Sequence, residues 1–124
     1  MNPDPERLWR LHVLVCTNER EPSHPRPSCG PRGGTELLAW FQEAIRRHKL
    51  NVEIRANRSG CLDACEAGPS VVVYPDAVWY TLRTQAEVER VVTEHLRDGR
   101  PVAELRMDFT PVPAWQARQK KQRS

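Results

Sequence analysis

A chain of 124 residues suits one domain with its own core and leaves little room for a second. Its formal charge is +3, but Arg118, Lys120, Lys121 and Arg123 lie in residues 109–124, which contain no acid, so residues 1–108 carry −1. A nucleic-acid-binding domain would need a basic face on its folded body. The sequence shows neither a signal segment at the N-terminus nor an apolar run that could span a membrane, so we expect a cytoplasmic protein without nucleic-acid or membrane partners.

The first half of the chain predicts two strands separated by a long loop and a helix. The apolar run 11–15 predicts a largely buried strand, and 17–34 predicts a loop rich in Pro, Gly and Ser. Such a long loop in a small domain calls for a functional explanation. Apolar residues at helical spacing predict a helix over 35–49 with Thr35 as its N-cap. Alternation over 52–57 then predicts a strand with one solvent-facing side, which Asn57–Gly60 ends.

The second half predicts two more strands and a second helix. Residues 70–74 read as a buried strand, and 77–82 as its hairpin partner. Thr84 is placed to cap a helix over 85–97, and Gly99 is placed to end it. His48 and His95 are expected on the apolar faces of the two helices rather than on a metal. The resulting order β-α-β-β-β-α predicts an α/β fold with two main helices against a mixed sheet.

The four cysteines are the residues that point most directly to chemistry. Their spacing is Cys16-x12-Cys29-x31-Cys61-x3-Cys65. Cys16 follows the first predicted strand and Cys61 follows the second. If those strands are parallel neighbours, both cysteines lie at the same edge of the sheet, where open α/β sheets place their sites. Four thiolates gathered there would suit an iron–sulfur cluster or a zinc ion.

The spacing leaves several alternatives open. A four-cysteine zinc site usually has two short C-x2-4-C pairs, and this chain has only one. A thiol–disulfide exchange protein typically contains C-x-x-C, which is missing. A Rieske centre needs two histidines, and His24 is the only histidine in a predicted site loop. Four unrelated buried thiols are a further alternative, although three of the four lie in polar loops.

Two motifs around these cysteines resemble the thioredoxin-like [2Fe–2S] ferredoxin family. The first reads VCTNER over 15–20, followed by HPR over 24–26 and SCG over 28–30. The second reads GCLDACEAGP over 60–69, followed by VVVYP over 71–75 and VWY over 78–80. The resemblance covers about residues 11–105, with residues 1–10 as an N-terminal extension and 106–124 as a basic, flexible tail. This part of the chain is also similar to the small [2Fe–2S] subunit of NADH dehydrogenase. That subunit usually has a shorter gap between its first two cysteines and an added helical segment, which this sequence lacks, so the resemblance points to a free-standing bacterial ferredoxin.

The resemblance implies a thioredoxin-like fold and an electron carrier rather than an enzyme. It implies one [2Fe–2S] cluster, with Cys16 and Cys29 on one iron and Cys61 and Cys65 on the other. It further implies redox proteins as donor and acceptor, and a homodimer. A role as a subunit or domain partner of an oxidoreductase stays open, as does the reduction potential, since cluster potentials vary widely with their surroundings.

Several neighbouring residues are candidates for tuning such a cluster. Glycine lets backbone N–H groups approach sulfur, and the helix beginning near Thr35 directs its positive end at the site loop. Asp63 and Glu66 are placed to steer a partner. The resemblance also makes Pro69 a candidate for a cis peptide bond. The remaining candidates are the glycines Gly30, Gly33 and Gly34, and the arginines Arg20, Arg26, Arg32 and Arg58.

Overall fold

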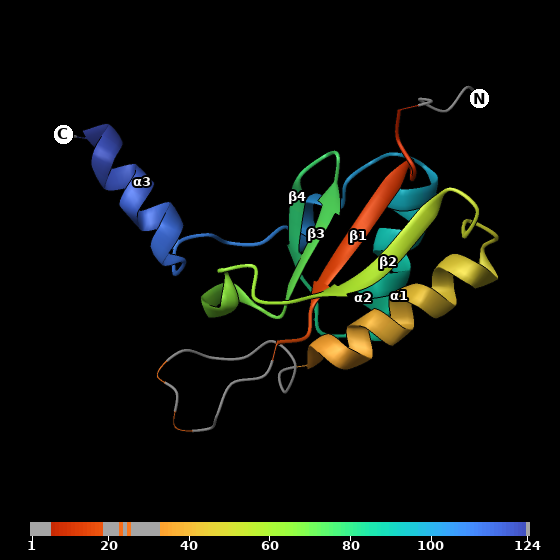
Figure 1. Ribbon diagram of the computed structural model, residues 1–124, viewed down its shortest axis with the longest axis horizontal. Coiled ribbons are helices and arrows are strands. Elements are labelled where there is room, and N and C mark those ends of the chain that lie inside the picture. The colour runs from red at the N-terminus through yellow and green to blue at the C-terminus, as the bar shows by residue number, and fades with distance from the viewer. Residues whose placement is uncertain (1–5, 19–22, 24, 26–32, 124) are drawn as a thin grey trace.

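The computed structural model describes residues 6–18, 23, 25 and 33–123, and for Cys65, Gln122 and Arg123 it describes the backbone. Its centre is a four-stranded mixed sheet of order β2-β1-β3-β4 (Figure 1). β1 pairs in parallel with β2 and antiparallel with β3, and β3 pairs antiparallel with β4. The strands are β1 (Leu11–Cys16), β2 (Ile54–Ser59), β3 (Ser70–Tyr74) and β4 (Val78–Thr81).

Two helices cover one face of this sheet. They are α1 (Thr35–Arg47) and α2 (Gln85–Arg90), and α2 continues as a wider π-helical segment over Val91–Arg97. Alternate residues of β1, namely Leu11, Val13 and Val15, face the helices and are buried with them in one core. The residues between them are only half buried, because successive side chains of a strand point to opposite faces. Among the described residues between 11 and 97, the strands and the two main helices therefore follow the predicted order.

The predicted boundaries shift where the chain leaves α1. The helix was expected to reach residue 49, but it ends at Arg47 because Lys49 takes a left-handed conformation with φ 61°. The following turn leaves Val52 85% exposed, so β2 begins at Ile54 instead of at 52. At its start, α1 has Gly34 as N-cap, so the expectation that Thr35 caps this helix is wrong. Thr35 is the first helical residue instead.

The second helix begins and ends as the sequence predicts. The Thr84 Oγ1 accepts the Glu87 N–H at 3.1 Å, and the Glu87 carboxylate accepts the Thr84 N–H at 3.2 Å. This reciprocal pair satisfies two N–H groups that the first turn of a helix leaves without partners. At the other end Gly99 takes φ 77°, a conformation that residues with a side chain rarely adopt, and the chain turns away from the helix.

A buried polar network joins the second helix to β4. His95 and Tyr80 are fully buried. The Tyr80 hydroxyl lies 2.8 Å from His95 Nδ1, and His95 Nε2 lies 2.8 Å from Asp76 Oδ2. The Tyr80 oxygen accepts the Val102 N–H at 3.0 Å. The Tyr80 hydroxyl can therefore donate its own proton to His95 Nδ1, and His95 Nε2–H can donate to the Asp76 carboxylate. Burial raises the pKa of Tyr80, which keeps the hydroxyl protonated.

Residues 106–123 contain more structure than the expected flexible tail. The Met107 N–H donates to the Trp79 carbonyl at 2.9 Å, and Met107 and Val112 are buried against Ala64. The chain then forms a third helix, α3 (Pro113–Arg123), which stands apart from α1 and α2 (Figure 1). Proline suits the first position of a helix, where its missing N–H costs nothing. Among the helices of the described ranges, none is long and apolar enough to cross a membrane.

Breaking the Tyr80–His95 hydrogen bond should lower the stability of the folded protein. Tyr80→Phe removes the hydroxyl and leaves the Val102 N–H and His95 Nδ1 buried without this partner, so we expect a destabilisation of about 1–3 kcal/mol. Thermal midpoints at one fixed heating rate measure it. The control is Tyr74→Phe, because Tyr74 is 43% exposed and should change stability little. Equal midpoints for the two variants would contradict the role given to the network.

Candidate metal centre

The parallel pairing of β1 with β2 brings two of the four cysteines to one edge of the sheet. Cys16, the last residue of β1, is the register partner of Ser59, the last residue of β2. The ladder continues one step further, since the Thr17 N–H donates to the Ser59 carbonyl at 3.3 Å. Cys61 lies two residues beyond Ser59. The expectation that these strands are parallel neighbours, with both cysteines at their carboxyl ends, is therefore confirmed.

The two cysteines differ in exposure. Cys16 is fully buried, whereas Cys61 is exposed. The Leu62 side chain, which follows Cys61 directly, packs against Cys16 and is half buried. This contact joins the end of β1 to the beginning of the Cys61–Cys65 loop, so the two segments are held together by packing as well as by the strand ladder.

A backbone turn between Cys61 and Cys65 directs an N–H group at sulfur. Asp63 takes φ 62°, a left-handed conformation that Asp tolerates better than most residues. In this turn the Asp63 N–H donates to Cys61 Sγ at 3.3 Å. A short 3₁₀ turn then runs over Cys65–Ala67. Such an N–H group stabilises negative charge on a thiolate, and hydrogen bonds to sulfur are one determinant of the potential of an iron–sulfur site.

Side chains from β3 and β4 hold this loop in place. The Ser70 hydroxyl donates to the Ala64 carbonyl at 3.1 Å, and the Thr81 hydroxyl donates to the Ala67 carbonyl at 2.6 Å. The Gly68–Pro69 peptide bond, which lies between Ala67 and Ser70 in the chain, is cis, as the resemblance suggested. The loop is thus attached to the sheet at two points, which limits how far Cys61 and Cys65 can move relative to β1.

The start of α1 lies across a hollow from the strand ends. This hollow of about 590 Å³ is bounded by Thr17 and Asn18 after β1, by Arg58–Gly60 at the end of β2, and by Thr35 and Leu38 of α1. The N-terminal turn of a helix carries partial positive charge from its N–H groups and favours an anionic neighbour. The exposed guanidinium of Arg58 adds a further cation at this rim. The hollow therefore suits an anionic group.

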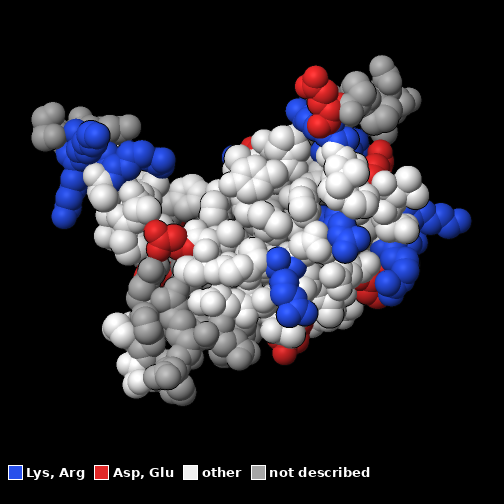
Figure 2. Space-filling view, viewed as in Figure 1, with Lys and Arg blue, Asp and Glu red and all other residues white. Residues whose placement is uncertain are grey.

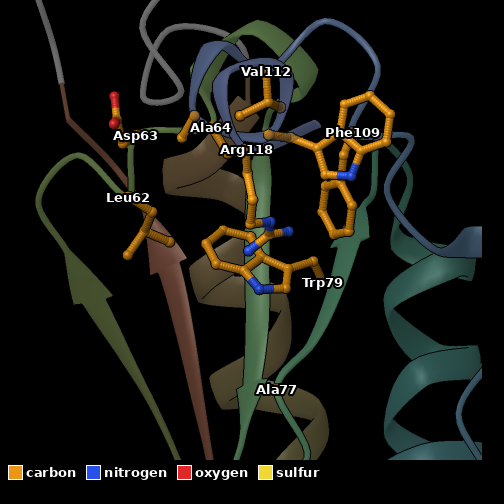
Figure 3. Close-up of a pocket in the computed structure, with 10 residues that line it drawn as sticks. Leu62, Asp63, Ala64, Ala77, Trp79, Phe109, Val112 and Arg118 are labelled. Carbon is orange, nitrogen blue, oxygen red and sulfur yellow. The ribbon is translucent and has the colours of Figure 1, made fainter. Parts of the chain in front are cut away.

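Aromatic side chains that the sequence reasoning did not assign to the site cover the other side of the loop. Trp79 and Phe109 meet edge to face, with ring centroids 6.4 Å apart. With Trp115 they line a pocket of about 330 Å³. Figure 3 shows Leu62, Asp63 and Ala64 across this pocket from Trp79 and Phe109. We call it the aromatic pocket. The signal in the sequence was the apolar set Met107, Phe109, Val112 and Trp115 inside the basic tail.

Part of the predicted site lies outside the described residues. This holds for Cys29, His24, Gly30, Arg20, Arg26 and Arg32, and only the backbone of Cys65 is described. Within the residues that are described, no three Cys, His, Asp or Glu side chains converge on one point. The described part nevertheless fits an iron–sulfur group in its donor chemistry. Two thiols approach one sheet edge, an N–H group points at one sulfur, and a helix start faces the same edge.

Comparison with known proteins places this arrangement in a family. No family model matches the chain. A protein named "Ferredoxin, 2Fe-2S" from Aquifex aeolicus is 42% identical over 95 residues, which are 76% of this chain and 86% of that protein. Another of that name, from Clostridium pasteurianum, is 34% identical over 96 residues, which are 77% of this chain and 94% of that protein.

Solved structures give the same result for the fold. The crystal structure of the wild-type thioredoxin-like [2Fe–2S] ferredoxin from Aquifex aeolicus superposes with a TM-score of 0.74 at 40% identity, covering 79% of this chain and 96% of that one. A second structure of a thioredoxin-like [2Fe–2S] ferredoxin from that organism gives 0.73 at 39% identity, covering 82% and 94%. The mixed α/β fold described above is thus thioredoxin-like, and the chain belongs to the family of thioredoxin-like [2Fe–2S] ferredoxins.

Proposed function

We propose that this protein carries single electrons on one [2Fe–2S] cluster bound by Cys16, Cys29, Cys61 and Cys65. The observation that carries the proposal is the placement of Cys16 and Cys61 at the carboxyl ends of two paired parallel strands. Family membership supports the identity of the cluster, because relatives that cover most of this chain are named 2Fe-2S ferredoxins. We assign Cys16 and Cys29 to one iron and Cys61 and Cys65 to the other.

The chain around these thiols is suited to hold negative charge. When bound, the cluster supplies a site that accepts and releases one electron, and with its four thiolates it carries about −2 or −3 charges. The Asp63 N–H lowers the cost of charge on the Cys61 sulfur. The start of α1 and the guanidinium of Arg58 act in the same direction from the rim of the hollow. Each of these groups favours the reduced, more negative state of the bound cluster.

The attachment of the Cys61–Cys65 loop also fits electron transfer. A carrier exchanges electrons readily when its ligands keep nearly the same positions in both redox states. The hydroxyls of Ser70 and Thr81 fix the loop to the sheet, and Leu62 packs on Cys16. We further propose that the protein works in the cytoplasm as a homodimer and exchanges electrons with separate redox proteins.

Purification without oxygen tests the function directly. We expect a brown protein with about two irons and two acid-labile sulfides per chain, bleached by dithionite, that elutes at twice the mass of one chain. Iron, sulfide and zinc assays and the visible spectrum measure this. A colourless protein with zinc would instead support a structural zinc module. A metal-free protein that reduces insulin disulfides would support a thiol-redox function.

Serine substitutions test the four ligands and their pairing. Cys16→Ser and Cys29→Ser should alter the Mössbauer signal of one iron, and Cys61→Ser and Cys65→Ser that of the other, because serine replaces a thiolate by an oxygen donor. Ser59→Ala is the matched control next to the site, since its hydroxyl bonds to the Gly60 carbonyl and not to a thiol. If Cys16→Ser and Cys29→Ser affect different irons, the pairing is wrong.

Loosening the loop should speed the loss of the cluster. Thr81→Val removes the hydroxyl that holds the Ala67 carbonyl, so we expect faster bleaching of the visible spectrum in the presence of an iron chelator. Thr93→Val is the control, because the Thr93 hydroxyl bonds to backbone carbonyls within the second helix, far from the loop in sequence. Equal bleaching rates for the two variants would show that this hydrogen bond does not secure the site.

A further inference from the structure

The C-terminal segment places a pocket and a basic helix beside the Cys61–Cys65 loop. The aromatic pocket has Trp79 and Phe109 on one side and the Leu62–Ala64 stretch of the loop on the other (Figure 3). Trp115 also lines it. Leu62, Asp63 and Ala64 are the residues between the two cysteines. Anything seated in this pocket therefore touches the loop that carries two of the proposed ligands.

The helix at the border of this pocket is cationic. Arg118 lines the pocket, and Arg118, Lys120 and Lys121 are all exposed on α3. No Asp or Glu occurs in residues 109–124. Figure 2 shows the Lys and Arg side chains of α3 gathered at one end of the molecule. Residues 1–108 carry a formal charge of only −1, so the net positive charge of the protein resides in residues 109–124.

We propose that the aromatic pocket and α3 together form the docking surface for an acidic redox protein. The partner seats one apolar side chain in the pocket and places carboxylates against Arg118 and Lys120. This inference rests on the proposed function and names the surface through which the electron passes. Electron transfer slows steeply with distance, and a partner docked here lies against the loop between Cys61 and Cys65.

The composition of the surface favours a protein over other occupants. Aromatic residues and arginine are enriched where protein interfaces carry their binding energy, and the pocket lining includes Trp79, Phe109, Trp115 and Arg118 beside aliphatic side chains. Redox encounters are typically small and guided by complementary charge. A nucleic acid would need a basic face on the body, which is near neutral. A second copy would bring an equally basic helix against this one.

Charge reversal tests the role of α3. The probes are two one-electron haem acceptors, the acidic cytochrome b5 and the basic cytochrome c. One electron leaves the reduced cluster-loaded protein and converts ferric haem to ferrous haem, and no bond forms or breaks. Arg118→Glu/Lys120→Glu should slow transfer to cytochrome b5 about tenfold at low ionic strength and should not slow transfer to cytochrome c. Arg46→Glu/Arg100→Glu changes net charge equally at exposed positions away from the pocket and should have a much smaller effect.

Filling the pocket tests the apolar anchor. Ala114 is exposed and lines the pocket, so Ala114→Trp should occlude it and slow transfer to cytochrome b5. Ala117 is also exposed on α3 but does not line the pocket, so Ala117→Trp is the matched control and should transfer electrons at the original rate. The visible spectrum and iron content of each variant show whether the cluster is intact.

The outcomes separate the two proposals. A protein that never holds iron refutes the proposed function, whereas intact clusters with unchanged rates in Arg118→Glu/Lys120→Glu refute the docking surface alone. Equal slowing in both charge-reversed pairs, or in both tryptophan variants, also overturns the docking surface. So does binding of duplex DNA or anionic vesicles that only Arg118→Glu/Lys120→Glu abolishes while electron transfer stays normal. A dimer that Ala114→Trp alone dissociates would assign the pocket to a second copy instead.

Discussion

The parallel ladder between β1 and β2 is the constraint on which the site depends. It fixes Cys16 opposite Ser59 and so sets where the chain must turn to deliver Cys61. A slip of the register by one residue would exchange the two faces of β1 and move Val13 and Val15 out of the core. The apolar core and the sheet edge that carries Cys16 and Cys61 are therefore specified by the same pairing, and neither can shift without the other.

The sequence was most informative where structure is determined locally. Short apolar runs predicted the buried strands at 11–15 and 70–74, and the pattern around Thr84 and Gly99 predicted both ends of the second helix. These signals lie within a few residues of the structure that they specify. The position of Cys16 and Cys61 at one edge required an added assumption, namely that two strands far apart in sequence are parallel neighbours, and the structure supplies it.

Other features depend on packing between distant segments, which local patterns do not show. The buried Cys16 is in contact with Leu62, which belongs to a loop 46 residues later in the chain. Trp79, beside the buried Tyr80 on β4, lies half buried under residues 107–115. Those residues looked like a basic tail because their few apolar side chains have no periodic order. The structure shows that these apolar residues pack against Ala64 and Trp79.

The pairing of Met107 with Trp79 also bears on the borders of the sheet. β4 ends the sheet on one side, and an uncovered border strand offers N–H and C=O groups to any passing strand. Here the Met107 N–H donates to the Trp79 carbonyl, and Arg106 forms an isolated antiparallel β-bridge with Tyr80. At the opposite border, β2 carries exposed Arg55 and Arg58, charges that discourage strand addition. The segment beyond residue 105 thus also protects the sheet against edge-to-edge aggregation.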